Sequence, residues 1–201
     1  MKKTVIVPVL FASLLLCNCH CTKSNPTDGT DSVKQKPATD TAMADSSIWG
    51  KMGEGTSMNV MEFVTDKGDT LYLSRFCEET GNDAEVKGDI RNFSDRFAVT
   101  MTGSNEEDVH SILSCVNVSQ LMGTWKDATG GTLTLYINGT ADKGPANYTA
   151  WQICNGRLIL SCKVSTEYGE TSRNDTMIID QLYEDSLKLL TPQHEVLSFG
   201  R

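Results

Sequence analysis

The sequence has no apolar run long enough to cross a bilayer as a helix. Its longest such run is the twelve residues from Val5 to Leu16, whereas a membrane-spanning helix needs about 20. Positive charge is also scarce, with 18 basic against 26 acidic residues and a formal net charge of −8. The first deficit excludes a transmembrane helix in this run, and the second disfavours partners that are rich in phosphate.

The deficit of positive charge is concentrated in one part of the chain. Residues 47–118 contain 6 basic and 13 acidic side chains, whereas residues 119–201 contain 7 and 9. Removal of the basic leader leaves a net charge of about −10 on the mature protein. Proteins that bind single-stranded nucleic acid combine a basic groove with stacking aromatic residues. We therefore expect no nucleic-acid partner.

Signatures of catalysis are lacking as well. The sequence has no Gly-x-Ser-x-Gly turn, no His-Glu-x-x-His and no glycine-rich phosphate loop. Only His110 and His194 lie outside the N-terminal tail, on separate segments, and a histidine base needs a partner within hydrogen-bond reach. We expect both to be surface residues. The sequence predicts a protein that is not an enzyme and holds neither a cofactor nor a metal.

The N-terminus has the organisation of a secretory signal. Met1-Lys2-Lys3 is a basic n-region, and the apolar run that follows has the length of an h-region. The run ends in Leu16-Cys17-Asn18-Cys19, which resembles a bacterial lipobox, where a leucine lies three residues before the lipidated cysteine. The resemblance implies a signal peptide over residues 1–18 and a mature chain anchored to a membrane by lipid.

Two cysteines compete for the lipid. Cys19 has Leu16 three residues before it and the small Asn18 directly before it. Cys17 has Leu14 at the same offset, but the bulky Leu16 directly precedes it. We favour Cys19, with Cys17 as the alternative.

Residues 19–46 are predicted to form a disordered tether. The segment consists mainly of Ser, Thr, Asp, Lys and Pro, with almost no large apolar residue. Such a composition cannot bury enough surface to offset the entropy lost on ordering.

Residues 47–118 show the period-two alternation of β-strands rather than helical spacing. A polar, glycine-containing loop at residues 65–69 indicates a hairpin between the first two strands. The five predicted strands are Asn59–Val64, Thr70–Leu73, Val86–Ile90, Arg96–Met101 and Ile112–Val118. Five strands at this spacing are similar to the oligonucleotide- and oligosaccharide-binding (OB) barrel, which implies a spacer or a module facing a sugar or a protein.

Residues 119–201 carry two strong hairpin signals. Asn138-Gly139 and Asn155-Gly156 are each typical of a type I′ turn, whose two central residues need positive φ. The first turn, after a strand at residues 132–137, predicts one face shared by Leu133, Leu135 and Ile137. The second pairs Cys154 with Arg157, Ile153 with Leu158 and Trp151 with Leu160. The face predicted from this second register consists of Trp151, Ile153, Leu158, Leu160 and Cys162.

Further strands are predicted at residues 176–182, 186–190 and 195–199. Seven or eight strands are enough to close a small barrel, filled mostly by side chains and with room for one small ligand at most. Tyr136 and Trp151 are the candidate residues to line a ligand site.

Gly123-Thr124-Trp125 fits the Gly-x-Trp signature that opens the first strand of lipocalin-like barrels. With the strands that follow, it makes the chain similar to Bacteroidetes-type lipoproteins with a C-terminal lipocalin-like domain. The resemblance implies that Trp125 plugs the closed end of the barrel and that Arg201, near the end of the last strand, lies across the indole. Gly123, Trp125 and Arg201 are thus the candidate barrel-closure residues. The same resemblance also implies that the protein is anchored at the outer membrane in the envelope of a Gram-negative bacterium.

The cysteines Cys77, Cys115, Cys154 and Cys162 could pair in an oxidising compartment. Cys154 and Cys162 fall on opposite faces of the predicted hairpin, and cysteines whose Cβ vectors diverge cannot bridge.

The sequence thus predicts an all-β protein of two small antiparallel barrels, OB-like over residues 47–118 and lipocalin-like over residues 119–201. One fused barrel over residues 47–201 is the alternative. The expected function is a non-enzymatic binding or scaffold module for a small apolar or glycan ligand or a partner protein. The contrasting hypothesis is a glycan-active hydrolase or isomerase, which aromatic and carboxylate side chains converging in one open cleft would favour.

Overall fold

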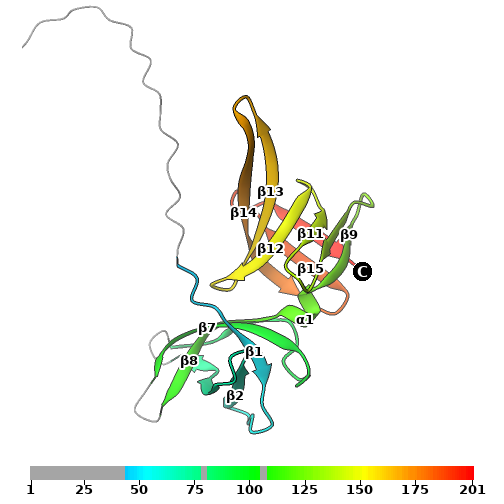
Figure 1. The fold of residues 1–201 in the computed structure, drawn as a ribbon. Helices are drawn as coiled ribbons and strands as arrows, with labels where there is room; N and C mark the ends of the chain where they lie inside the picture. The colour runs from blue at the N-terminus through cyan, green and yellow to red at the C-terminus, as the bar shows by residue number, and fades with distance from the viewer. Residues whose placement is uncertain (1–43, 78–80, 105–107) are drawn as a thin grey trace, which may run out of the picture. The chain divides into compact units, whose positions relative to one another are not determined.

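The computed structural model of the protein describes residues 44–77, 81–104 and 108–201 (Figure 1). Both of its large sheets belong to one compact unit that extends to Arg201. In this part of the chain, no helix is long and apolar enough to cross a membrane. Cys17 and Cys19 lie outside the described residues, as does all of the predicted tether before residue 44.

The first sheet closes into a five-stranded ring. Its strands follow the order β1–β2–β3–β8–β7, and β7 pairs again with β1. The β3–β8 pairing that completes the ring is parallel, and β6 adds to the other end of β8, also in parallel. The strands are β1 (Ile48–Met52), β2 (Val60–Thr65), β3 (Thr70–Ser74), β6 (Glu85–Lys87), β7 (Arg96–Ser104) and β8 (Val109–Asn117), with a separate pair formed by β4 (Phe76–Cys77) and β5 (Asn82–Asp83).

Two strands of this sheet differ from the sequence prediction. β1 was not predicted, although it lies between β2 and β7. The strand predicted at Val86–Ile90 ends at Lys87, because Gly88 has a φ of +90° and turns the chain away. Gln120 Oε1 then accepts the N–H of Asp89 at 2.7 Å. The number of strands in the ring is therefore as predicted, but β1 takes the place of the strand predicted at Val86–Ile90.

The second sheet is a nearly closed up-and-down arrangement of eight antiparallel strands. β9 pairs with both β10 and β16, and the remaining neighbours follow chain order. The gap between β11 and β12 is spanned by a single bridge from Thr140 to Ala150. The strands are β9 (Gly123–Asp127), β10 (Thr132–Leu135), β11 (Ala141–Lys143), β12 (Tyr148–Cys154), β13 (Arg157–Thr166), β14 (Gly169–Leu182), β15 (Ser186–Leu190) and β16 (Val196–Gly200). The all-β prediction with two small barrels is confirmed.

The β12–β13 hairpin follows the predicted register. Asn155 and Gly156 have φ values of +49° and +75°, as a type I′ turn requires. Trp151 pairs with Leu160, and Cys154 pairs with Arg157. All five residues of the predicted inner face are buried, where each large apolar side chain contributes about 1.5–3 kcal/mol.

The turn at Asn138-Gly139 corrects the prediction. Gly139 has a φ of +80°, whereas Asn138 is not among the residues with positive φ. The N–H of Gly139 donates to Tyr136 O at 3.0 Å, and the N–H of Tyr136 donates to Thr140 O at 2.9 Å, which defines a three-residue loop with a glycine bulge. Ile137 therefore lies in the loop and is 75% exposed, so it does not share the face of the buried leucines of β10.

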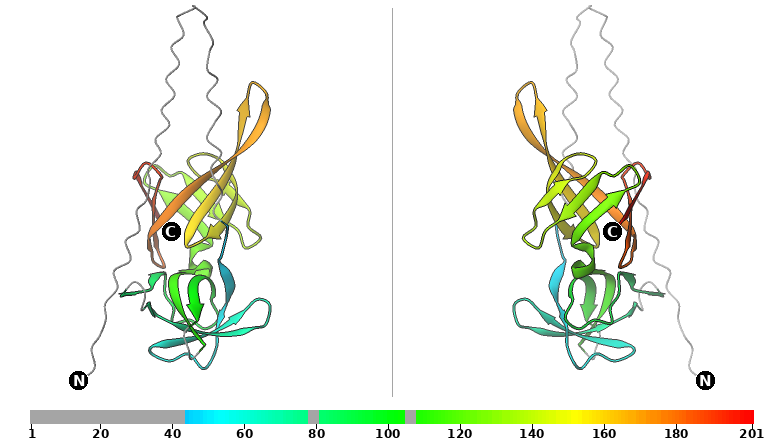
Figure 2. Two further views of the ribbon diagram at one scale, coloured as in Figure 1. Left: turned by 90° about the vertical axis from the view of Figure 1, so that its left-hand side faces the viewer. Right: turned by 90° about the vertical axis from the view of Figure 1, so that its right-hand side faces the viewer.

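The β13–β14 hairpin continues past its neighbours (Figure 2). β13 and β14 stay paired from Arg157 and Ile178 out to Thr166 and Gly169, while β12 accompanies β13 only as far as Cys162. The outer part of this hairpin is mostly exposed.

The two sheets meet at a packed joint formed by α1 (Val118–Leu121) and the β12–β13 turn. Ala98 and Val116 of the first sheet belong to the apolar core of the second. At the turn, a Cβ added to Gly156 would overlap the side chain of Ser114. The Oδ1 of Asn155 accepts the N–H of Ser46 at 3.0 Å, so the last residues of the predicted tether are fixed here. The domain boundary near residue 119 stays a prediction.

Candidate functional site

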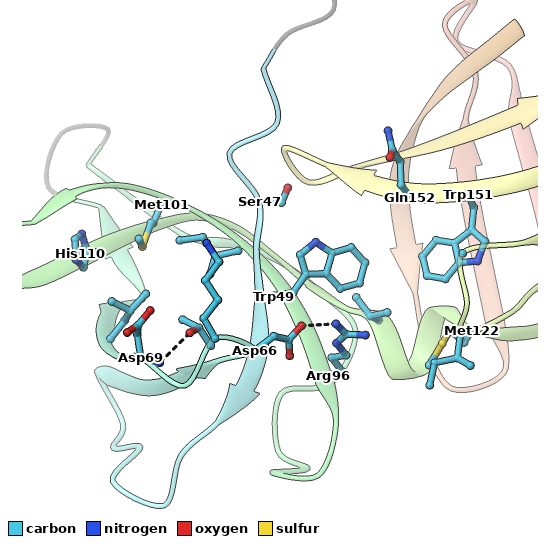
Figure 3. A pocket seen from close by; sticks show the side chains of 17 residues that line it. Ser47, Trp49, Asp66, Asp69, Arg96, Met101, His110, Met122, Trp151 and Gln152 are labelled. Carbon is cyan, nitrogen blue, oxygen red and sulfur yellow. Dashed lines mark hydrogen bonds and ion pairs between the residues drawn. The ribbon is translucent and has the colours of Figure 1, made fainter. Parts of the chain in front are cut away.

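An open groove of about 740 Å³ lies where the two sheets meet (Figure 3). Its volume is within the range of roughly 300–1,000 Å³ that is usual for small-molecule sites. The lining surface is mostly apolar, although half of the lining side chains are polar or charged. The groove is lined by Ser47, Ile48, Trp49, Thr65, Asp66, Lys67, Asp69, Leu71, Arg96, Met101, His110, Val118, Met122, Ile137, Gly139, Trp151 and Gln152.

Trp49 forms the middle of the groove together with an ion pair. On β1 and β7, Trp49 is opposite Ala98 and Lys51 is opposite Arg96, so Arg96 is the diagonal neighbour of Trp49. Its guanidinium lies 5.0 Å from the centroid of the Trp49 ring and forms an ion pair with Asp66. The N–H of Asp66 donates to Trp49 O at 2.8 Å. These contacts hold an indole, a cation and an anion next to one another.

Trp151 forms the end of the groove that belongs to the second sheet. It is 6% exposed, and its indole N–H donates to Tyr136 O at 2.8 Å. Its backbone N–H donates to Gly139 O at 2.8 Å, which places the Ile137 loop beside it. The structure thus puts one of the two candidate ligand-lining residues, Trp151, in the groove. Tyr136 contributes the carbonyl that orients Trp151, and its own side chain is 47% exposed outside the lining set.

The remaining polar groups of the groove are near the β2–β3 turn and β8. The backbone N–H of Asp69 donates to Thr65 Oγ1 at 3.1 Å, which fixes the turn that carries Lys67. His110 lies at the far end with its Nδ1 3.3 Å from Thr102 O. Two lysine or arginine cations and two carboxylates thus line the groove, so its fixed charges balance.

The structure brings together the three predicted barrel-closure residues. The Arg201 guanidinium lies 4.2 Å from the centroid of the Trp125 ring. Gly123 has a φ of +122°, and a Cβ there would be 3.4 Å from the Arg201 side chain. Trp125 is fully buried, and its indole N–H donates to Leu121 O at 2.8 Å. Their role in closing the barrel stays a prediction.

Arg201 also holds the joint that lines one wall of the groove. Its Nη2 donates to Gln120 O at 2.5 Å and to Met122 O at 2.7 Å, and its Nη1 donates to Glu184 O at 3.0 Å. The side chain of Gln120 in turn accepts the N–H of Asp89, which lies between β6 and β7. The C-terminal residue therefore fixes the segment from which Met122 enters the groove.

Cys115, Cys154 and Cys162 are free thiols in the structure. Cys162 is buried inside the second sheet, whereas Cys154 is only half-buried on the other face of the hairpin, as predicted. Burial raises the pKa of Cys115 to about 12, against a smaller opposing effect of the Arg75 cation. Such a thiol is inert at neutral pH, because the thiolate is the reactive form. Within the described ranges, no cluster of His, Cys, Asp and Glu is arranged to hold a metal ion.

Sequence reasoning missed most of this groove. It found Trp151 from the hairpin register, but it assigned no role to Trp49, Arg96 or Asp66, and it placed His110 on the surface. One signal was available, since Trp49 is one of only three tryptophans and lies in the short alternating run of β1.

Comparisons of the chain with protein-family models, with curated proteins and with solved structures found no match.

Proposed function

We propose that the protein is a lipid-anchored, non-enzymatic binding protein of a bacterial envelope, which takes a small ligand in the groove between its two sheets. The observation that carries the proposal is the groove itself. Trp49 from the first sheet and Trp151 from the second both line it, so the site exists only when the two sheets are joined. A concave, mostly apolar site with a few polar groups is the usual form of a ligand site.

The topology supports the same proposal. A five-stranded ring of order β1–β2–β3–β8–β7 is the arrangement expected of an OB-like barrel, a fold that serves ligand binding. An eight-stranded up-and-down sheet is the arrangement of lipocalin-like barrels. The interior of the second sheet is filled by the apolar side chains of its own core, which directs the proposed ligand to the groove.

The anchoring part of the proposal rests on the leader and the cysteine at position 19. A chain held by lipid at Cys19 enters the described body at residue 44, and Ser47 already lines the groove. The ligand site would therefore be presented close to the point of attachment of the tether.

Native mass spectrometry of the protein purified from its own envelope tests the proposal, because it reports lipid and retained ligand together. Ile137→Glu places a charge in the groove at a residue that is 75% exposed, so the fold should be kept. Val196→Glu is the matched control, since Val196 is 58% exposed and does not line the groove. We expect a bound mass that is lost only from Ile137→Glu. A bound mass that is equal in both variants, or no bound mass besides the anchor, would refute the groove as the binding site.

One observation favours a glycan-active enzyme as the second candidate. Asp66 and Asp69 line the same open groove as the two indoles, and hydrolases of glycans use paired carboxylates. Asp66 is already paired with Arg96, which leaves Asp69 as the available acid. Incubation with neutral oligosaccharides should show no new reducing ends if the protein only binds. Turnover that is lost in Asp69→Asn would support the enzyme instead.

A further inference from the structure

The groove is extended, with the partly buried indole of Trp49 at its middle and the small exposed part of Trp151 at one end. Figure 3 shows Trp49 between two groups of side chains, with Met101 and His110 on one side and Met122 and Trp151 on the other. A single compact ligand would leave one of these groups uncovered. The arrangement fits an elongated molecule with repeated flat units.

We propose that the ligand is a neutral oligosaccharide that lies along this groove with one sugar ring against Trp49 and a later ring toward Trp151, an inference that rests on the proposed function of the same site. A pyranose ring has apolar C–H faces and a rim of hydroxyl groups. Its C–H face carries a weak positive charge that complements the electron-rich face of an indole. The hydroxyl rim needs donors and acceptors at the edge of that aromatic surface.

The ion pair beside Trp49 supplies those groups. A guanidinium has five N–H donors in a fixed fork. In the hydrogen bond from the side chain of Arg96 to Asp66, the donor is Nη2. Among the described residues, the other side-chain contact of Arg96 is the Trp49 ring. In the same part of the chain, no ion pair involves the ammonium of Lys67 or the carboxylate of Asp69. Donors and acceptors for hydroxyl groups thus remain on both sides of the indole.

The balance of charge selects a neutral ligand. Lys67 and Arg96 offset Asp66 and Asp69 within the groove, while the protein as a whole carries a net charge of −8. An acidic ligand would gain nothing locally and would be repelled by the whole surface. A wholly apolar ligand would bury Lys67 and Asp69 without hydrogen-bonding partners, which is costly. A hydroxylated, uncharged ligand with apolar faces avoids both penalties.

Fluorescence titration of the mature full-length protein tests this inference. The probes are the neutral hexasaccharides of glucose, N-acetylglucosamine, mannose and xylose, with the hexasaccharide of galacturonic acid as the anionic probe and N-phenyl-1-naphthylamine as the apolar one. Trp125 is fully buried and Trp151 is only 6% exposed, so Trp49 should dominate the change in emission. We expect saturable binding of at least one neutral hexasaccharide and weaker binding of the galacturonate.

Variants locate the binding site and separate stacking from hydrogen bonding. Trp49→Ala should weaken binding of that hexasaccharide at least about tenfold, equivalent to about 1.4 kcal/mol, and Trp49→Phe should restore part of it because it keeps a flat face. Arg96→Lys keeps the charge but loses the fork, so it should weaken binding severalfold. Val196→Ala, outside the groove, should leave the affinity unchanged. Circular dichroism and thermal unfolding check that each variant is folded.

The outcomes distinguish this inference from the proposed function. One outcome is that the naphthylamine binds, that Ile137→Glu abolishes this binding, and that no neutral hexasaccharide binds. In that case the inference is overturned while the groove remains a ligand site. If the galacturonate binds more tightly than every neutral sugar, the charge argument is wrong and the inference fails. If neither the sugars nor the naphthylamine bind, both proposals fail. Binding that Trp49→Ala and Trp49→Phe leave unchanged would also overturn the inference.

Discussion

The guanidinium of Arg201 lies 4.2 Å from the centroid of the Trp125 indole, and it donates at the same time to the carbonyls of Gln120 and Met122. The first and last strands of an eight-stranded sheet are adjacent because β9 pairs with β16. The contact thus joins residues that are 76 positions apart in the chain, and it links the end of the chain to the joint between the two sheets.

A double-mutant cycle on Trp125→Phe and Arg201→Gln measures this contact. We expect a coupling free energy near the lower end of the usual cation–π range of about 0.5–2 kcal/mol, since Arg201 is exposed. Arg201→Gln alone should cost about 1–2 kcal/mol, because hydrogen bonds to carbonyl groups are lost as well. Urea unfolding followed by circular dichroism gives the four free energies. A coupling free energy indistinguishable from zero would show that the contact between Trp125 and Arg201 does not stabilise the closed barrel.

The anchor is tested by substitution of the two leader cysteines. Cys19→Ala should release the protein from the membrane fraction and abolish acyl labelling, while Cys17→Ala should leave both unchanged. The reason is the spacing of Leu16 and Asn18 relative to Cys19. Metabolic labelling with an alkynyl fatty acid, followed by fractionation, provides both readouts. The lipoprotein hypothesis fails if neither substitution changes them.

The boundary near residue 119 is tested with a fragment of residues 119–201. A domain of this size buries only about 60% of its unfolded surface, so the fragment should fold but be marginally stable. The loss of Ala98 and Val116, which pack against its core in the full protein, should lower its stability further. Circular dichroism and amide dispersion in NMR spectra report the result. A wholly unfolded fragment would favour one fused unit over residues 47–201.

The buried thiol of Cys115 predicts a loss of stability at alkaline pH. Its pKa is raised from 9.0 to about 12 in the folded protein because of burial, so folding favours the protonated form. The contribution of this thiol to the free energy of unfolding is complete below pH 9. It falls by about 1.4 kcal/mol per pH unit as the pH rises toward 12. Urea unfolding at pH 8 and pH 10.5 should therefore show a smaller loss of stability in Cys115→Ala than in the wild type. Equal losses would show that Cys115 is accessible to water.

The sequence alone determined the features that depend on neighbouring residues. Asn155-Gly156 fixed a type I′ turn, and through it the pairing of Trp151 with Leu160, since turn geometry sets the register of a hairpin. The alternation of apolar residues determined an all-β fold for the same reason. Asn138-Gly139 marks the limit of such reasoning, because the same dipeptide lies in a three-residue loop between β10 and β11 instead of a type I′ turn.

Only the tertiary structure decided which residues line the groove. Trp49 and Trp151 are 102 positions apart in the chain, and each is unremarkable within its own strand. They face one groove because α1 and the Asn155 turn fix one sheet against the other, and Arg96 reaches Trp49 only through the pairing of β1 with β7. Local periodicity carries no information about such contacts, because it is the packing of whole sheets that brings these residues together.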